Sequence, residues 1–404
     1  MTYFINLSEQ QYVNSLCEQL KKISKKEDLI ISYLGDTEIL YPLDSEEMCV
    51  IDFFHKFHDI LQNHEGQIFY LSSDMNISQR YDEWCNFYGT AKKFNVLLTP
   101  FYLYPTVSDE NILEIQEKNK NFCCLCSNPT VIRAMLLDFF YKHDNFIYSM
   151  APYHDVEPIP GELVFLSNPM KWDKNFERIV IYETYYNKTK VVHYDGFLKF
   201  KEFLLHVNTI HMTKNIFSFP NGFKLSRDYK RLTEIDTKKM DYLTRRNNYL
   251  PLECYKSCCD VVMETSPIKN SVFFTEKTMK EILYNRPYLC FGAKKQNIFL
   301  KKLGFELYDE IFDYSFDSDL NVKERLNLFV EQIKKYLDFD IFEFDNYIQN
   351  NIKDKIDYNR IKLIEYGNKF LPIYDDLNKY EKNQILRLDK KDRILDFFEK
   401  NQFN

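Results

Sequence analysis

CDVVMET at residues 259–265, FFTEK at 273–277 and RPYLCFG at 286–292 are the three runs that decide the fold. The first and third runs are apolar and strand-like, and the second places a threonine, an acid and a lysine where a helix would begin. A strand, a loop, a helix and a further strand, in that order, form the repeating unit of a parallel sheet covered by helices. We therefore predict an α/β fold for this half of the chain.

The predicted helix start carries a carboxylate and an ammonium group side by side, Glu276 and Lys277. Backbone N–H groups at a helix N-terminus favour anions, so a lysine there is misplaced by roughly 0.3–1 kcal/mol unless an anion lies nearby. A cap at Thr275 and an acid in the first turn have a purely structural explanation, whereas Lys277 has none. A ligand with a diphosphate for the lysine and a ribose for the acid fits this pair, which predicts a nucleotide-sugar site.

Residues 1–115 are expected to form one Rossmann-like domain. Apolar strand-like runs alternate there with amphipathic helical runs, and such alternation is typical of a parallel sheet with helices on its faces. The strand-like runs are 29–34, 67–71 and 96–98, and the helical runs are 45–63 and 77–94.

A second domain is expected over residues 116–340, where a new strand-like run at 122–126 follows a polar stretch. Asn128 is the predicted cap of the next helix, and Arg133 lies near the start of that helix. Arg133 and Lys277 would then both lie at helix starts of one parallel sheet, beyond the carboxyl ends of its strands, where ligands bind. Two cations and two helix ends could hold one diphosphate. Residues 341–404 are lysine-rich and amphipathic, and we expect a helical tail that packs back on both domains.

Composition argues against several classes of protein. A net charge of −7 and a pI near 5.7 are not typical of a dedicated nucleic-acid binder. No charged leader opens the chain and no window approaches a membrane span, so we expect neither secretion nor membrane insertion. Ten cysteines without the spacing of a disulfide scaffold favour the cytoplasm, or the host cytoplasm if the gene is viral. The nine glycines form neither GxGxxG nor a Walker loop, so a phosphate site must use helix ends and cations.

No metal site is expected. Cys123-x-x-Cys126 and Cys254-x-x-x-Cys258 could in principle supply four thiolates to a zinc ion. Residues three apart in a strand point to opposite faces, however, which favours buried cysteines without a metal.

These runs together resemble a known family. The chain resembles the nucleotide-binding half of the α1,3-fucosyltransferases and related GT-B glycosyltransferases at three places. These are Ser127-Asn128-Pro129 with Arg133, Glu264-Thr265, and Phe274-Thr275-Glu276-Lys277. The wider run from Thr275 to Asp317 also resembles glycosyltransferase-like proteins of phages and large viruses. The resemblance covers residues 120–335. Its Ser-to-Arg spacing is one residue shorter than the fucosyltransferase pattern, and Thr265 stands where that pattern has asparagine, which leaves the base and the sugar open.

The resemblance implies a GT-B enzyme, in which two Rossmann-like domains face one another across a cleft. It implies an inverting transfer from a GDP- or UDP-sugar, without a metal or a permanently bound cofactor. Arg133 and Lys277 would hold the diphosphate, and Glu276 would hold the ribose. The implied nucleotide-sugar site comprises Ser127, Asn128, Arg133, Glu264, Thr265, Thr275, Glu276 and Lys277.

An inverting transfer needs a carboxylate that removes the proton of the acceptor hydroxyl. Asp36 and Asp74 each follow a strand-like run of the first domain, and both are candidates for this base. The acceptor could be a glycan or a hydroxylated base of modified DNA, because a cleft can be locally positive whatever the net charge. The alternative function is a non-catalytic nucleotide-binding or scaffold protein with the same fold, which the missing base motif in the first hundred residues favours.

Overall fold

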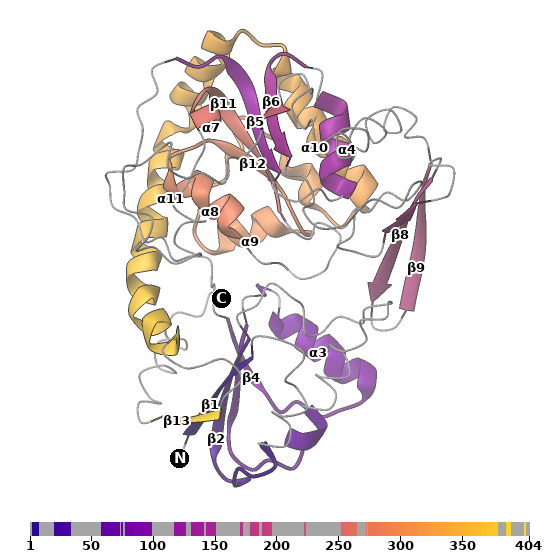
Figure 1. Ribbon diagram of the computed structural model, residues 1–404, viewed down its shortest axis with the longest axis vertical. Helices are drawn as coiled ribbons and strands as arrows, with labels where there is room; N and C mark the ends of the chain where they lie inside the picture. The colour runs from indigo at the N-terminus through magenta and orange to yellow at the C-terminus, as the bar shows by residue number, and fades with distance from the viewer. Residues whose placement is uncertain are drawn as a thin grey trace.

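The structure is a computed structural model of the 404-residue chain. Two mainly parallel sheets form two bodies that lie one above the other along the long axis (Figure 1). The residues that the structure describes are 2–7, 20–33, 58–72, 74–75, 77–98, 117–126, 131–140, 143–150, 170–172, 178–185, 188–195, 222–223, 252–264, 272, 274–378, 385–388 and 400.

The first sheet has the strand order β13-β1-β2-β3-β4, and β1 to β4 are parallel. Helix α3 (Ile77–Tyr88) connects β3 to β4. Every residue of β3 is buried, as expected for a parallel strand covered on both faces. The alternation predicted for this region is therefore confirmed where the structure describes it. The strands are β1 (Thr2–Leu7), β2 (Asp28–Tyr33), β3 (Ile68–Ser72), β4 (Asn95–Leu98) and β13 (Ile385–Leu388).

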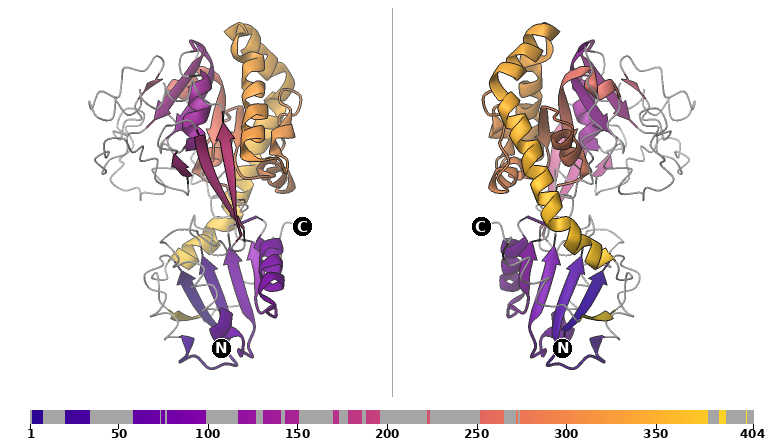
Figure 2. Two further views of the ribbon diagram at one scale, coloured as in Figure 1. Left: turned by 90° about the vertical axis from the view of Figure 1, so that its right-hand side faces the viewer. Right: turned by 90° about the vertical axis from the view of Figure 1, so that its left-hand side faces the viewer.

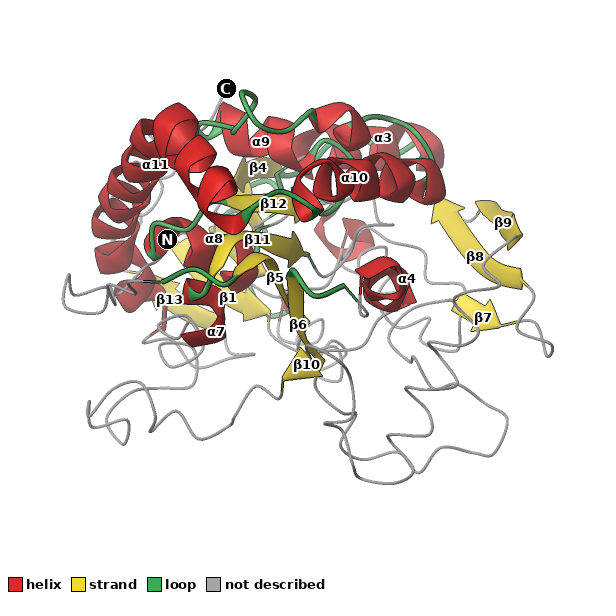
Figure 3. Ribbon diagram, turned by 90° about the horizontal axis from the view of Figure 1, so that it is seen from above, coloured by secondary structure: helices red, strands yellow, loops and turns green. Residues whose placement is uncertain are grey.

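The second sheet has the order β10-β6-β5-β11-β12, and all of its pairs are parallel. Viewed from above, α4 and α10 lie on one side of this sheet and α7 and α8 on the other (Figure 3). The strands are β5 (Lys120–Cys126), β6 (Phe146–Met150), β10 (Gly222–Phe223), β11 (Ser257–Met263) and β12 (Tyr288–Phe291). The helices are α4 (Val131–Phe140), α7 (Leu252–Tyr255), α8 (Glu276–Leu283), α9 (Gln296–Lys302) and α10 (Val322–Leu337), with a 3-10 turn at Tyr314–Asp317. A separate antiparallel sheet comprises β7 (Met170–Trp172), β8 (Arg178–Tyr185) and β9 (Lys188–Asp195).

Helix α11 (Ile341–Asn378) connects the two bodies. It packs on α8, β5 and β11 of the second body and then crosses to the first, as both side views show (Figure 2). None of the described helices, α11 included, is apolar enough over a sufficient length to cross a membrane.

The expectation of a wholly helical tail needs a correction. Ile385–Leu388 is strand β13, which pairs antiparallel with β1. This short apolar run is compatible with either a helix or a strand by periodicity alone. Pairing covers the backbone groups of β1, which would otherwise be exposed at the edge of the sheet.

A buried ion pair ties α10 to the end of β12. The Arg325 guanidinium donates to Gly292 O at 2.7 Å and to Ala293 O at 3.1 Å, and lies 4.0 Å from the Asp317 carboxylate. Burial raises the pKa of Asp317 to about 6 and lowers the pKa of Arg325 to about 10. For both groups, loss of hydration therefore outweighs their mutual attraction.

Asp317→Asn is expected to change the pH dependence of stability. Because the folded pKa of Asp317 lies above its ordinary 3.8, the folded protein binds more protons than the unfolded chain between about pH 4 and 6. Proton binding by Asp317 therefore stabilises the folded protein below about pH 4, and this stabilisation is lost as the pH rises through about 6. The change is on the order of 2–3 kcal/mol. Urea denaturation measures the free energy of unfolding of both proteins at pH 4 and at pH 7. From pH 4 to pH 7, the stability of the variant should rise relative to that of the parent protein. A constant difference between the two proteins would contradict the shifted pKa.

Candidate functional site

The second sheet contains a topological switch point between β5 and β11. The chain leaves β5 through α4 to β6, and leaves β11 through α8 to β12, so the two connections run in opposite directions from neighbouring strands. Right-handed crossovers then place the two helices on opposite faces, and ligands of open α/β sheets generally bind beyond the carboxyl ends of the strands at such a point. The prediction that the Arg133 and Lys277 helices belong to one sheet is confirmed.

Glu264 fixes the start of α8 to the end of β11. Its buried carboxylate accepts from Thr275 N at 3.2 Å and from the Thr275 hydroxyl at 2.5 Å, and it also accepts from the Thr278 hydroxyl. Thr275 in turn caps the helix, since Oγ1 accepts from Lys277 N at 3.2 Å. The family resemblance implies that Glu264 belongs to the nucleotide-sugar site. In the structure its oxygens are occupied by the helix start, and Thr278, one turn beyond Thr275, is the partner that sequence reasoning missed.

Lys277 folds back over the first turn of α8. Its Nζ lies 3.3 Å from Glu276 Oε1 and 3.3 Å from Thr275 Oγ1. The lysine side chain is 14% exposed and that of Glu276 is 7% exposed. The expectation that Lys277 has no structural explanation needs revision, because the neighbouring acid supplies a countercharge. The pair nevertheless leaves an ammonium group, a carboxylate and a helix N-terminus at one place.

Arg133 lies at the same strand end. It is 2% exposed, and Nη2 donates to Met263 O, the last carbonyl of β11, at 2.9 Å. Met263 directly precedes Glu264, which holds Thr275, and Thr275 contacts Lys277. A continuous path of contacts therefore runs from Arg133 to Lys277 across the carboxyl end of β11. Arg133 reaches this point from α4, and Lys277 reaches it from the start of α8.

Asp74 is the base candidate that the structure describes. It is 8% exposed, and its Oδ1 accepts from Val272 N at 3.0 Å. The other candidate, Asp36, lies outside the described residues, as do Ser127, Asn128 and Thr265.

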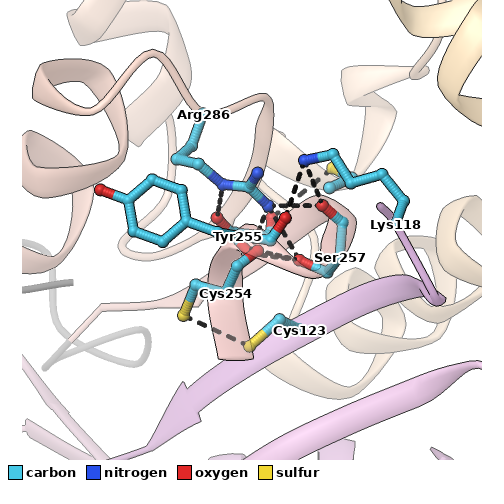
Figure 4. A network of polar contacts seen from close by, with 8 residues as sticks. Lys118, Cys123, Cys254, Tyr255, Ser257 and Arg286 are labelled. Carbon is cyan, nitrogen blue, oxygen red and sulfur yellow. Dashed lines mark hydrogen bonds and ion pairs between the residues drawn. The ribbon is translucent and has the colours of Figure 1, made fainter. Parts of the chain in front are cut away.

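A second polar network lies at the opposite, amino-terminal end of the strands (Figure 4). Arg286 Nε donates to Asp260 Oδ2 at 2.7 Å, and Arg286 Nη2 donates to Ser257 O at 2.8 Å. Lys118 Nζ donates to Tyr255 O and to Ser257 O, both at 3.0 Å. Burial lowers the pKa of Lys118 to about 8. These bonds satisfy backbone carbonyls where α7 meets β11, which is a structural role.

Cys123 and Cys254 lie next to this network, with their sulfur atoms 3.5 Å apart. With Asp260 they bring three possible metal ligands within 4.8 Å of one another. Burial raises the pKa of both thiols, to about 11 for Cys254, which favours the protonated form over the thiolate that metals bind. The Asp260 carboxylate already accepts from Arg286 and from the Ser257 hydroxyl. The geometry therefore favours two buried thiols over a metal centre.

No protein-family model matches the chain, and no curated protein sequence matches it. Among solved structures, the DNA modifying enzyme beta-glucosyltransferase, studied with and without uridine diphosphoglucose, is similar at 9% identity and a TM-score of 0.35, covering 93% of this chain and 100% of that one. A structure of T4 phage beta-glucosyltransferase that describes its substrate binding is also similar, at 8% identity and a TM-score of 0.34. The match covers 92% of this chain and 98% of that one. Likeness of this degree assigns neither fold nor activity, so a function has to be inferred from the strand order and from the contacts at the start of α8.

Proposed function

We propose that the chain is a glycosyltransferase that moves a sugar from a nucleoside-diphosphate sugar to a hydroxyl acceptor. The proposal includes a GT-B arrangement, with residues 1–115 as the acceptor domain and 116–340 as the donor domain. The observation that carries it is the start of α8, where Lys277 and Glu276 lie at the switch point of a parallel sheet. Arg133 adds a second cation at the adjoining strand end.

The site offers separate groups to the two halves of such a donor. A diphosphate can accept from the first-turn N–H groups of α8 and from Lys277 Nζ, since a helix N-terminus and a cation both favour an anion. In doing so it competes with Glu276 for the lysine. The displaced Glu276 carboxylate can then accept hydrogen bonds from the ribose hydroxyls. The donor is a GDP- or UDP-sugar, and no permanently bound cofactor is needed.

The transfer itself needs a carboxylate base from the acceptor domain, on the face of the sugar opposite the departing diphosphate. Asp36 and Asp74 are the candidates. The acceptor is a hydroxyl group of a glycan or of a hydroxylated nucleobase in modified DNA.

A specific observation favours a second function, a non-catalytic nucleotide-binding or scaffold protein. Asp74 is buried, and its carboxylate is engaged by a backbone N–H group, which makes it less available as a base.

Sugar-nucleotide hydrolysis and nucleotide affinity, measured together on the full chain, distinguish the two functions. The transferase should bind UDP or GDP and should slowly hydrolyse one of the matching sugar nucleotides. Binding without turnover over a broad acceptor panel would favour the scaffold. Failure of every nucleoside diphosphate to raise the melting temperature would contradict both functions, because a ligand of the native state stabilises it.

A further inference from the structure

Two hydrogen bonds form a joint between the loops that follow strand β3 of the first sheet and strand β11 of the second. On the side of the first sheet the joint consists of Asp74 and Met75, which follow β3, and on the side of the second sheet it consists of Val272. Met75 N donates to Val272 O at 2.6 Å, and Val272 N donates to Asp74 Oδ1 at 3.0 Å. Both backbone polar groups of Val272 are therefore bonded to the segment that follows β3.

Asp74 is itself held in place. Its N–H donates to the Ser72 hydroxyl at 3.2 Å, and its carbonyl accepts from Ile77 N, at the start of α3, at 3.1 Å. Both Asp74 and Val272 are buried, so water does not readily replace the bond between them. Leaving a buried backbone N–H without an acceptor costs the folded protein a free energy comparable to a lost hydrogen bond. The Asp74 carboxylate is therefore a strong constraint on Val272.

Val272 lies three residues before Thr275, the cap of α8. The start of α8 is therefore anchored twice. Glu264 ties it to the end of β11, and Asp74 ties the segment before it to the first sheet. Both anchors act on the chain beside the first turn of α8, which carries Lys277.

We propose that Asp74 is a positioning residue, which acts through the Val272 N–H group to set the first turn of α8 and so links the placement of the first sheet to donor binding. The part that concerns the donor rests on the proposed function of this site. This role needs an acceptor oxygen at Oδ1 and no negative charge, whereas a base needs an ionised carboxylate. An asparagine can replace the aspartate in the first role but not in the second.

The test compares Asp74→Ala with Asp74→Asn in the full chain, with the exposed Asp59→Ala as a matched control. Hydrogen exchange at the Val272 amide reports the joint directly, and calorimetric titration with UDP and GDP reports the donor site. Asp74→Ala should speed exchange at Val272 and weaken diphosphate affinity by about tenfold each, the scale of one buried hydrogen bond. Asp74→Asn should rescue most of both losses, and Asp59→Ala should change neither.

Two outcomes overturn the proposal. One is unchanged exchange and affinity in Asp74→Ala. The other is an equal loss of sugar-nucleotide hydrolysis in both Asp74 variants while Asp74→Asn keeps the protection of Val272, since that pattern identifies a base. If the parent protein binds neither UDP nor GDP, the proposed function fails, but the exchange measurement still decides whether Asp74 holds Val272.

Discussion

Arg286→Met is expected to lower the free energy of unfolding by about 3–5 kcal/mol, the usual cost of removing one partner of a buried ion pair. Arg286 and Asp260 are both buried, and Arg286 also donates to the Ser257 hydroxyl at 2.8 Å. Burial and the Asp260 carboxylate raise the pKa of the adjacent Glu281 well above its usual range, which favours its protonated form. Arg286 then balances the single charge of Asp260. Methionine fills a similar space but removes the guanidinium that contacts this buried charge.

Urea denaturation at pH 7 measures this effect, with two variants as references. Lys353→Met breaks an exposed pair with Asp357 and should cost less than about 1 kcal/mol. The double variant Asp260→Asn, Arg286→Met removes both charges and should recover part of the loss. A cost for Arg286→Met no larger than that of Lys353→Met would contradict a structural role for the network.

Lys277→Ala is expected to weaken the binding of UDP and GDP by about 1.5–3 kcal/mol, the contribution of a hydrogen bond to a charged group. The ammonium group lies over the first turn of α8, where a diphosphate would also meet the helix N–H groups. Alanine removes the cation and leaves the Thr275 cap in place, because that bond uses the backbone N–H of residue 277. Calorimetric titration measures the change directly.

Lys323→Ala is the matched control for this prediction. Lys323 is the second residue of α10, as Lys277 is the second residue of α8, but α10 does not start at the switch point. The control should therefore leave UDP and GDP affinity unchanged. Equal affinities of the Lys277→Ala variant and the parent protein would remove Lys277 from the site.

The part of the fold predicted best from sequence is the unit formed by β11, α8 and β12. Its apolar runs have strand length, and Thr275 gives a specific helix-start signal, which the observed cap confirms. The Lys277–Glu276 contact was not predicted, because residues adjacent in sequence do not normally face each other on a helix. Pairing of β13 with β1 was missed because it joins opposite ends of the chain.

The Arg286 network could have been anticipated in part. Asp260 stands in the middle of an apolar strand, and a buried carboxylate needs a cationic or hydrogen-bonding partner. That partner is Arg286, which lies just before β12. It reaches Asp260 because β11 and β12 are neighbours and Asp260 is in register with Tyr288. Sequence alone gives the need for a partner, whereas its identity depends on strand order and register. The same limit applies to Val272, whose bond to Asp74 joins loops that follow strands of two separate sheets.

Comparing each nucleoside diphosphate with its parent nucleoside tests the central claim most directly, because the claim concerns the diphosphate. Calorimetric titration of the full chain with UDP and uridine, and with GDP and guanosine, gives the two differences. We expect at least one diphosphate to bind about tenfold or more tightly than its nucleoside, the factor expected from one charged contact. Equal affinities within both pairs, or no binding of either diphosphate, would contradict a diphosphate site at the start of α8.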